Sequence, residues 1–219
     1  MSVDTTKAPP RLSPIRRALS LTWRFIRLEW HMYTSTARLI ARRPDVPRGG
    51  AGFRYDAGSR MILIVFIVLS AVEIAVVDLI VHQWPGVRIA FLVVGIWGLL
   101  WMIGLLSANI VRPHTVGPDG IRIRDGLGTD VAIPWDDVQA VEIKKRALPQ
   151  KTPRITTLDD VPAFVLAVSD AANIQIDLEG PTRVRLPGHA PKGGEHTVER
   201  VCFWTDDPKA FLAEVGRHI

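Results

Sequence analysis

Two acidic residues, Glu73 and Asp78, lie in the otherwise apolar stretch VLSAVEIAVVDLIV at positions 68–81. A carboxyl group inside a membrane costs free energy, so it indicates a function such as carrying protons or ions, or contact with a partner. Because the two acids are five residues apart, they point about 140° apart around a helix. This spacing argues against a proton relay formed by the pair.

Trp97 is the polar partner that we expect for Glu73. A helical hairpin folded about Pro85 brings the two residues to the same level, and the indole N–H is a donor that a carboxyl group needs in hydrocarbon. We therefore predict an anchor in which Glu73, Asp78 and Trp97 are internal polar groups. Contact with another membrane protein is the second interpretation, and conduction of protons or ions is the third.

Basic side chains form two candidate surfaces for anionic lipid or an acidic partner. The first surface is a predicted long loop that contains Lys144, Lys145, Arg146, Lys151 and Arg154. The second is the polar side of a predicted N-terminal helix and contains Arg16, Arg17, Arg24 and Arg27. A solvated run of charges without a ligand explains the first surface equally well.

The sequence carries no pattern that is typical of an active site. Its six histidines show no paired metal-ligand spacing, and a single cysteine, Cys202, excludes a zinc cluster built on several thiolates. Phosphate-binding loops and nucleophile elbows are missing. We therefore predict a non-enzymatic protein that has no cofactor and no metal, with Cys202 as a small core residue.

The acids belong to the first of two long apolar runs, at 61–82 and 88–111. At 1.5 Å per residue, each run is long enough to cross a hydrocarbon core about 30 Å thick. Pro85 and Gly86 mark a tight turn between them. The pattern predicts a two-helix transmembrane hairpin.

Charge is unevenly distributed along the 219 residues, whose net charge is +5. Residues 1–60 carry twelve Lys and Arg against four Asp and Glu, whereas residues 112–219 carry fourteen against sixteen. The basic excess therefore borders the first span, and the turn between the spans holds only Arg88. By the positive-inside rule we expect a multi-pass protein of the cell membrane with both termini cytoplasmic. The acidic balance of the C-terminal half argues against a nucleic-acid partner.

The N-terminal region divides into three segments. Residues 1–14 are rich in proline and are expected to be disordered. Residues 15–43 have a helical period of apolar residues, set by Ile15, Leu19, Trp23, Ile26, Trp30 and Tyr33. A basic helix with such a face is typical of the headgroup layer, although the face could also pack on the protein's own domain or on a partner helix. Residues 44–60 read as a linker.

Residues 112–219 have the alternation of a β-domain. Predicted strands lie at 121–124, 130–133, 138–144, 163–169, 174–178, 183–186 and 199–204. A final helix begins at Pro208, with Asp207 as its N-cap.

Three motifs in this region, GPDGIRIRDG, VAIPWDDVQAVEI and VCFWTDDPKAFLAEV, resemble those of bacterial pleckstrin homology (PH)-like domains attached to membrane helices. The resemblance implies a β-barrel or sandwich of seven strands closed by a C-terminal helix. The turn that binds lipid in many PH domains reads DGLGTD here and has no basic residue, so that site does not transfer.

A hairpin joined to a PH-like domain predicts an adaptor or accessory subunit of a membrane protein complex. Its expected partners are membrane lipids and other membrane proteins. The alternative is a module that recognises anionic lipid through the two basic surfaces, and a small oligomeric transporter is the third possibility.

Overall fold

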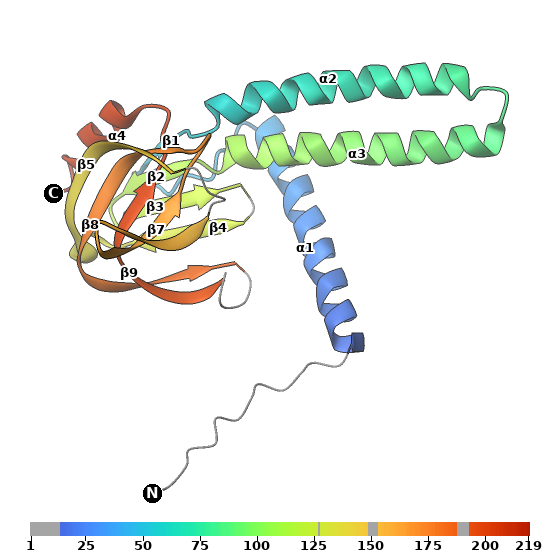
Figure 1. The fold of residues 1–219 in the computed structure, drawn as a ribbon. Coiled ribbons are helices and arrows are strands. Elements are labelled where there is room, and N and C mark those ends of the chain that lie inside the picture. Colours follow the sequence, from blue (N-terminus) through green and yellow to red (C-terminus); the bar gives the residue numbers. More distant parts are fainter. Residues whose placement is uncertain (1–13, 127, 149–152, 188–192) are drawn as a thin grey trace, which may run out of the picture.

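The computed structural model describes residues 14–126, 128–148, 153–187 and 193–219. A long helical hairpin projects from one side of a sheet-rich domain, and a separate helix crosses the hairpin close to that domain (Figure 1).

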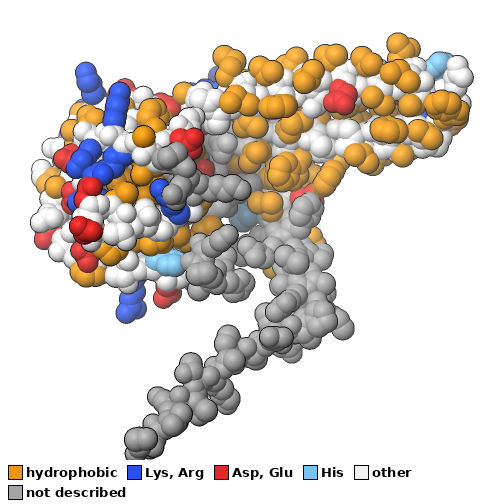
Figure 2. Space-filling view, in the orientation of Figure 1, with side chains coloured by type: hydrophobic (Ala, Val, Ile, Leu, Met, Phe, Trp, Pro, Cys, Tyr) orange, Lys and Arg blue, Asp and Glu red, His pale blue; other side chains and the backbone are white. Residues whose placement is uncertain are grey.

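The hairpin consists of α2 (Ala57–Ile80) and α3 (Pro85–Val111). Pro85 occupies the first turn of α3, where its missing N–H costs no hydrogen bond. Both helices are long and apolar enough to cross a membrane, and most of their apolar side chains point outwards (Figure 2). The first helix begins four residues before the predicted position 61, because Arg60 N–H already bonds the Asp56 carbonyl.

Helix α1 (Pro14–Ile40) packs against the half of α3 that is next to the domain. Met32 lies against Gly104, where an added Cβ would come within 2.9 Å of the Met32 Cβ. The absence of a side chain at Gly104 therefore allows the close approach of the two helices. After Ile40 the chain leaves the helix through Arg42, which has a positive φ of 53°.

The first sheet has the antiparallel order β1-β2-β3-β4. Its strands are β1 (Ala51–Phe53), β2 (His114–Gly117), β3 (Gly120–Asp125) and β4 (Thr129–Ile133). β1 precedes the hairpin and β2 follows it, and Phe53 pairs with His114. The prediction of a linker at 44–60 is therefore wrong for β1. Phe53 reaches the domain core, with its ring 5.1 Å from that of Phe211.

The second sheet has five strands in the order β5-β8-β9-β7-β6. They are β5 (Val138–Ala147), β6 (Arg154–Leu158), β7 (Val161–Leu166), β8 (Ala171–Leu186) and β9 (Gly194–Phe203). The short 3-10 helix η1 (Trp135–Asp137) leads into β5. All neighbours are antiparallel except β7 and β9.

The PH-like arrangement of sheets and final helix is confirmed, but the number of strands differs from the prediction. Among the described residues, eight strands follow the hairpin instead of the predicted seven, and the two sheets do not close into a barrel. β2 and β6 were not predicted, and the segments 174–178 and 183–186 are one strand, β8, with a register shift after Asp177. This irregularity interrupts the two-residue alternation, which is why one strand reads as two.

Helix α4 (Pro208–Val215) covers the core between the sheets. The predicted cap is confirmed: the Asp207 carboxylate accepts the Ala210 N–H at 3.0 Å. Phe211 and Val215 are buried, and the Phe211 ring meets Phe203 edge to face at 5.4 Å. Burial of these apolar side chains is the main stabilising contribution of the helix.

Candidate functional site at the base of the hairpin

The start of α2 is fixed by a buried carboxylate. The Asp56 side chain is 1 % exposed and accepts hydrogen bonds from Arg60 Nε at 2.9 Å and Nη2 at 2.7 Å. Arg54 Nε donates to the same carboxylate at 3.3 Å. A buried carboxylate is stable only when its lone pairs are filled, and two guanidinium groups do so here.

The loop between β9 and α4 holds the same segment from the domain side. The Arg54 carbonyl accepts from Asp206 N–H at 2.8 Å and from the Thr205 hydroxyl at 3.1 Å. The Ala57 N–H donates to Asp206 Oδ2 at 3.1 Å. Main-chain and side-chain bonds therefore tie the base of the hairpin to the domain.

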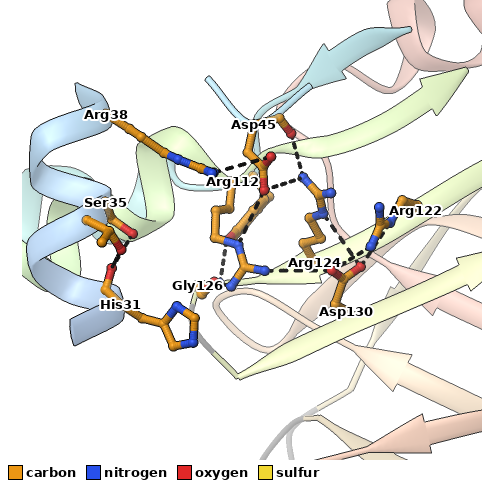
Figure 3. A network of polar contacts seen from close by, with 11 residues as sticks. His31, Ser35, Arg38, Asp45, Arg112, Arg122, Arg124, Gly126 and Asp130 are labelled. Atoms are coloured by element: carbon orange, nitrogen blue, oxygen red, sulfur yellow. Dashed lines mark hydrogen bonds and ion pairs between the residues drawn. The ribbon is translucent and has the colours of Figure 1, made fainter. Parts of the chain in front are cut away.

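The end of α3 is fixed by a cluster of arginines and two acids (Figure 3). Arg124, whose side chain is 3 % exposed, lies 3.6 Å from Asp45 and 3.5 Å from Asp130. Arg112 lies 3.6 Å from Asp130 and donates to the Gly126 carbonyl at 3.2 Å. Burial lowers the pKa of Arg124, while the two carboxylates oppose this effect.

The cluster also includes α1. Arg38 lies 3.3 Å from Asp45, and the Asp45 N–H donates to the Val111 carbonyl at 2.8 Å. Asp45 therefore joins the end of α1, the end of α3 and strand β3, which carries Arg124. The cluster therefore connects α1 to α3 and β3, which come much later in the sequence.

His114 and Tyr55 form the buried centre of this base. His114 Nε2 donates to the Trp204 carbonyl at 2.9 Å, and Nδ1 accepts the Arg124 N–H at 3.0 Å. Acceptance at Nδ1 needs the neutral ring, and burial lowers the pKa of His114 to about 3. The Tyr55 hydroxyl accepts the Gly126 N–H at 2.7 Å, and burial raises its pKa.

The contacts of Asp56, the arginine cluster, His114 and Tyr55 together form a rigid joint between the hairpin and the domain. Most buried polar groups of the joint bond another part of the same chain, as Asp56, His114 and Tyr55 do, whereas Arg124 Nε contacts Asp130 only as an ion pair at 3.5 Å. Among the described residues, no group of three or more His, Cys, Asp or Glu could hold a metal ion. Cys202 is buried, and burial raises its pKa to about 11.

Within the hairpin, the predicted pairing of Glu73 with Trp97 is wrong. The Trp97 indole N–H donates to Glu29 of α1 at 3.1 Å. Asp78 binds Arg88, whose Nε and Nη2 donate to its two carboxylate oxygens at 2.5 and 2.9 Å. Neither partner was predicted from the sequence, although Asp78 and Arg88 lie symmetrically, five residues either side of Gln83.

Glu73 is exposed on the side of the hairpin. It borders a groove of about 430 Å³ between α2 and α3, which is also lined by Ser70, Ile74, Gly95 and Gly98. Within the described parts of the chain, no hydrogen bond or ion pair reaches the Glu73 carboxyl. The two acids of the hairpin therefore differ: Asp78 has an internal partner and Glu73 does not.

The first predicted basic surface is divided between two strands. Lys144, Lys145 and Arg146 lie on β5, whereas Arg154 begins β6 at the opposite edge of the same sheet. Lys151 lies outside the described residues. Arg146 binds Asp159 and donates to Gln175 at 3.2 Å, so part of this charge is used within the domain.

The four arginines of the second basic surface fall within helix α1. The side chains of Arg16, Arg17, Arg24 and Arg27 lie outside the described part of the structure. Among the described side chains of this helix, five large apolar ones are exposed: Trp23, Ile26, Trp30, Tyr33 and Ile40.

Comparison with known proteins found a match for the sheet-rich domain that follows the hairpin. Residues 112–218 match the family of the bacterial PH domain. Neither the curated proteins nor the solved structures gave a match. The matched residues comprise β2 to β9 and α4, in the order expected from the motifs of the sequence. The C-terminal domain thus matches the bacterial PH family and is joined directly to two helices long enough to cross a membrane.

Proposed function

We propose that this protein is a non-enzymatic integral membrane protein that holds its PH domain against the cytoplasmic face of the cell membrane. In this proposal it acts as an adaptor or accessory subunit of a membrane protein complex. The observation that carries the proposal is Glu73, which has no partner within the described chain and borders a groove between α2 and α3.

Two observations support a hairpin with both ends on one side. β1 and β2 flank the hairpin and pair with each other, with Phe53 opposite His114. Paired strands lie about 5 Å apart, so the two ends of the hairpin cannot lie on opposite faces of a bilayer. The basic excess of residues 1–60 supports the assignment of that face to the cytoplasm.

The orientation of α1 supports a location in the headgroup layer. Met32 and Ser35 are buried on the side that faces α3. Trp23 and Trp30, each 67 % exposed, lie on the opposite side of the helix at 3.6 residues per turn. Aromatic side chains of this kind are favoured where hydrocarbon meets headgroups.

Glu73 points to a partner inside the membrane. An acid at mid-bilayer costs about 3 kcal/mol on the insertion scale, and such residues in membrane proteins pair with one another or face an interior. Gly95 is already packed against Ile74 of α2, whereas a Cβ at Gly98 would meet no atom within 4 Å, so Gly98 leaves room for a neighbouring helix to approach closely. The partner that fits is a transmembrane helix of another protein with a cationic side chain at the depth of Glu73.

Co-purification from membranes in mild detergent, followed by mass spectrometry, tests the proposal. We expect Glu73→Gln to reduce the captured partner about tenfold at unchanged abundance, because an ionic hydrogen bond is lost. Gly98→Leu should do the same by filling the groove. A Cβ at Gly98 meets no atom within 4 Å, so the hairpin itself tolerates the change.

Val76→Leu is the matched control, because Val76 is exposed on the same helix but does not line the groove. It should capture the partner as the wild type does. If both Glu73→Gln and Gly98→Leu retain every protein captured by the wild type, the groove is not the docking site and the adaptor proposal fails.

A further inference from the structure

A second cavity lies where α1, β1 and the end of α3 meet. It measures about 460 Å³, and its lining includes four arginines, Arg38, Arg42, Arg43 and Arg54. An apolar wall of the same cavity includes Leu39, Ile110 and Val111. The cavity is therefore lined by both cationic and apolar side chains.

The four arginines are not all neutralised. Arg38 lies 3.3 Å from Asp45, and Arg54 lies 3.3 Å from Asp56. Asp56 is itself shared with Arg60 at 2.7 Å. No acid of the described chain forms an ion pair with Arg42 or Arg43, and both are exposed. The cavity thus has an excess of positive charge, and two of its guanidinium groups are free to bind an anion.

The backbone at Arg42 is unusual. Its φ of 53° lies in the left-handed region, which a helix C-terminus normally fills with glycine. The Arg43 N–H closes the helix end by donating to the Arg38 carbonyl at 3.0 Å. An arginine therefore stands where glycine would be less strained, and strain of this kind is often found at binding sites.

The position of the cavity matches the level of lipid headgroups. Ile110 and Val111 end the apolar run of α3, and Arg112 follows directly. If α2 and α3 span the membrane as proposed above, the apolar wall faces acyl chains and the arginines face phosphate groups. Guanidinium groups bind phosphate through two parallel hydrogen bonds.

We propose that this cavity binds the phosphate group of one anionic phospholipid, with Arg42 and Arg43 as its main ligands and the apolar wall in contact with an acyl chain. The site lies outside the residues matched to the PH family, apart from Pro113 at its edge. It rests on the proposed membrane insertion but not on the partner at Glu73.

Native mass spectrometry of the full chain in neutral detergent tests this site, because no anionic surface is then present to attract charge generally. The protein is titrated with phosphatidylglycerol, with phosphatidylcholine and with glycerol phosphate. We expect one phosphatidylglycerol to bind, and phosphatidylcholine and glycerol phosphate to bind at least about tenfold more weakly.

The decisive variant is Arg42→Gly, alone and combined with Arg43→Gln. Glycine adopts the left-handed backbone without strain, so the melting temperature should not fall while the affinity for phosphatidylglycerol drops about tenfold. Arg48→Gln is the control, since Arg48 lies in the same segment but does not line the cavity. It removes an equal charge and should leave lipid binding unchanged.

Four results overturn the site: unchanged lipid binding in Arg42→Gly and in the double variant, an equal loss in Arg48→Gln, equal affinity for phosphatidylcholine, or equal affinity for glycerol phosphate. The last result would identify a site for a soluble phosphate. Glu73→Gln should bind lipid as the wild type does, so failure of the lipid site and failure of the partner site are separately visible.

Discussion

Tyr55 and His114 stack with their ring centroids 4.6 Å apart and their planes inclined by 27°, although the entire hairpin separates them in the sequence. Tyr55 lies just before the first helix of the hairpin, and His114 lies just after the second. Both are buried, and each bonds a backbone group on the other side of the joint. The stack therefore fixes the two ends of the hairpin to each other and to the domain.

Tyr55→Phe tests the contribution of the hydroxyl group. The change leaves the ring stack intact but removes the acceptor of the buried Gly126 N–H. An unsatisfied buried donor costs about 1–3 kcal/mol, so we expect a lower free energy of unfolding and a lower melting temperature in detergent. Tyr33→Phe, at an exposed tyrosine, is the control and should melt like the wild type. Equal melting of all three proteins would contradict the role of the hydroxyl.

The pH dependence of stability should follow His114. Its folded-state pKa of about 3 is below the usual value of about 6.5, so the unfolded chain takes up a proton first. The contribution of His114 to stability is complete above pH 6.5 and is lost as the pH falls. Between pH 6 and 5 the loss approaches about 1.4 kcal/mol per pH unit.

Thermal unfolding of the wild type and of His114→Gln from pH 7.5 to pH 5 provides the measurement. We expect the wild type to lose more stability than the variant over this range. Nitrogen NMR shifts should also report a neutral His114 ring with its proton on Nε2 at pH 5. A ring that titrates near pH 6.5 in the folded protein would refute the prediction.

Gly104→Leu should separate α1 from α3. An added Cβ comes within 3.0 Å of two Met32 atoms, and overpacking of this kind costs about 1–3 kcal/mol. Gly98→Leu, on the same helix but in open space, is the matched control and should retain the wild-type melting temperature. If the two variants melt alike, the contact between Met32 and Gly104 does not hold α1 in place.

Reporter fusions should locate both termini in the cytoplasm. A fusion after Ile219 should give a cytoplasmic signal, and a reporter inserted between residues 82 and 88 should give a periplasmic one. The pairing of β1 with β2 demands that the two ends of the hairpin share one side. A periplasmic signal from the C-terminal fusion would rule out the orientation.

The parts of the fold that were predictable have a strong local pattern. The two apolar runs of the hairpin and the Asp207-Pro208 start of α4 depend on neighbouring residues, and the structure has them. β1 was not predictable, because three residues, Ala51, Gly52 and Phe53, carry too little alternation. Their strand conformation depends on β2, which follows only after the hairpin.

The polar contacts of the hairpin also differ in whether they could be predicted from the sequence. Asp78 and Arg88 flank one tight turn, so their ion pair could have been inferred from the hairpin alone. The partner of Trp97 could not, because Glu29 comes from α1, whose packing on α3 depends on the shapes of Met32 and Gly104. The arginine cavity was equally inaccessible, since it is formed by three elements that only the tertiary structure brings together.

The pairing of β1 with β2 also determines the order of events during synthesis. Chains emerge from the ribosome N-terminus first, so β1 is made before the hairpin and has no strand to pair with until β2 follows. If the two helices span the membrane as proposed, both must enter the bilayer before β1 can meet β2 and the first sheet can form. We then expect a chain whose hairpin fails to insert to leave Phe53 outside the core. Insertion would thereby become a condition for complete folding of the domain, and uninserted chains would be substrates for cellular proteases.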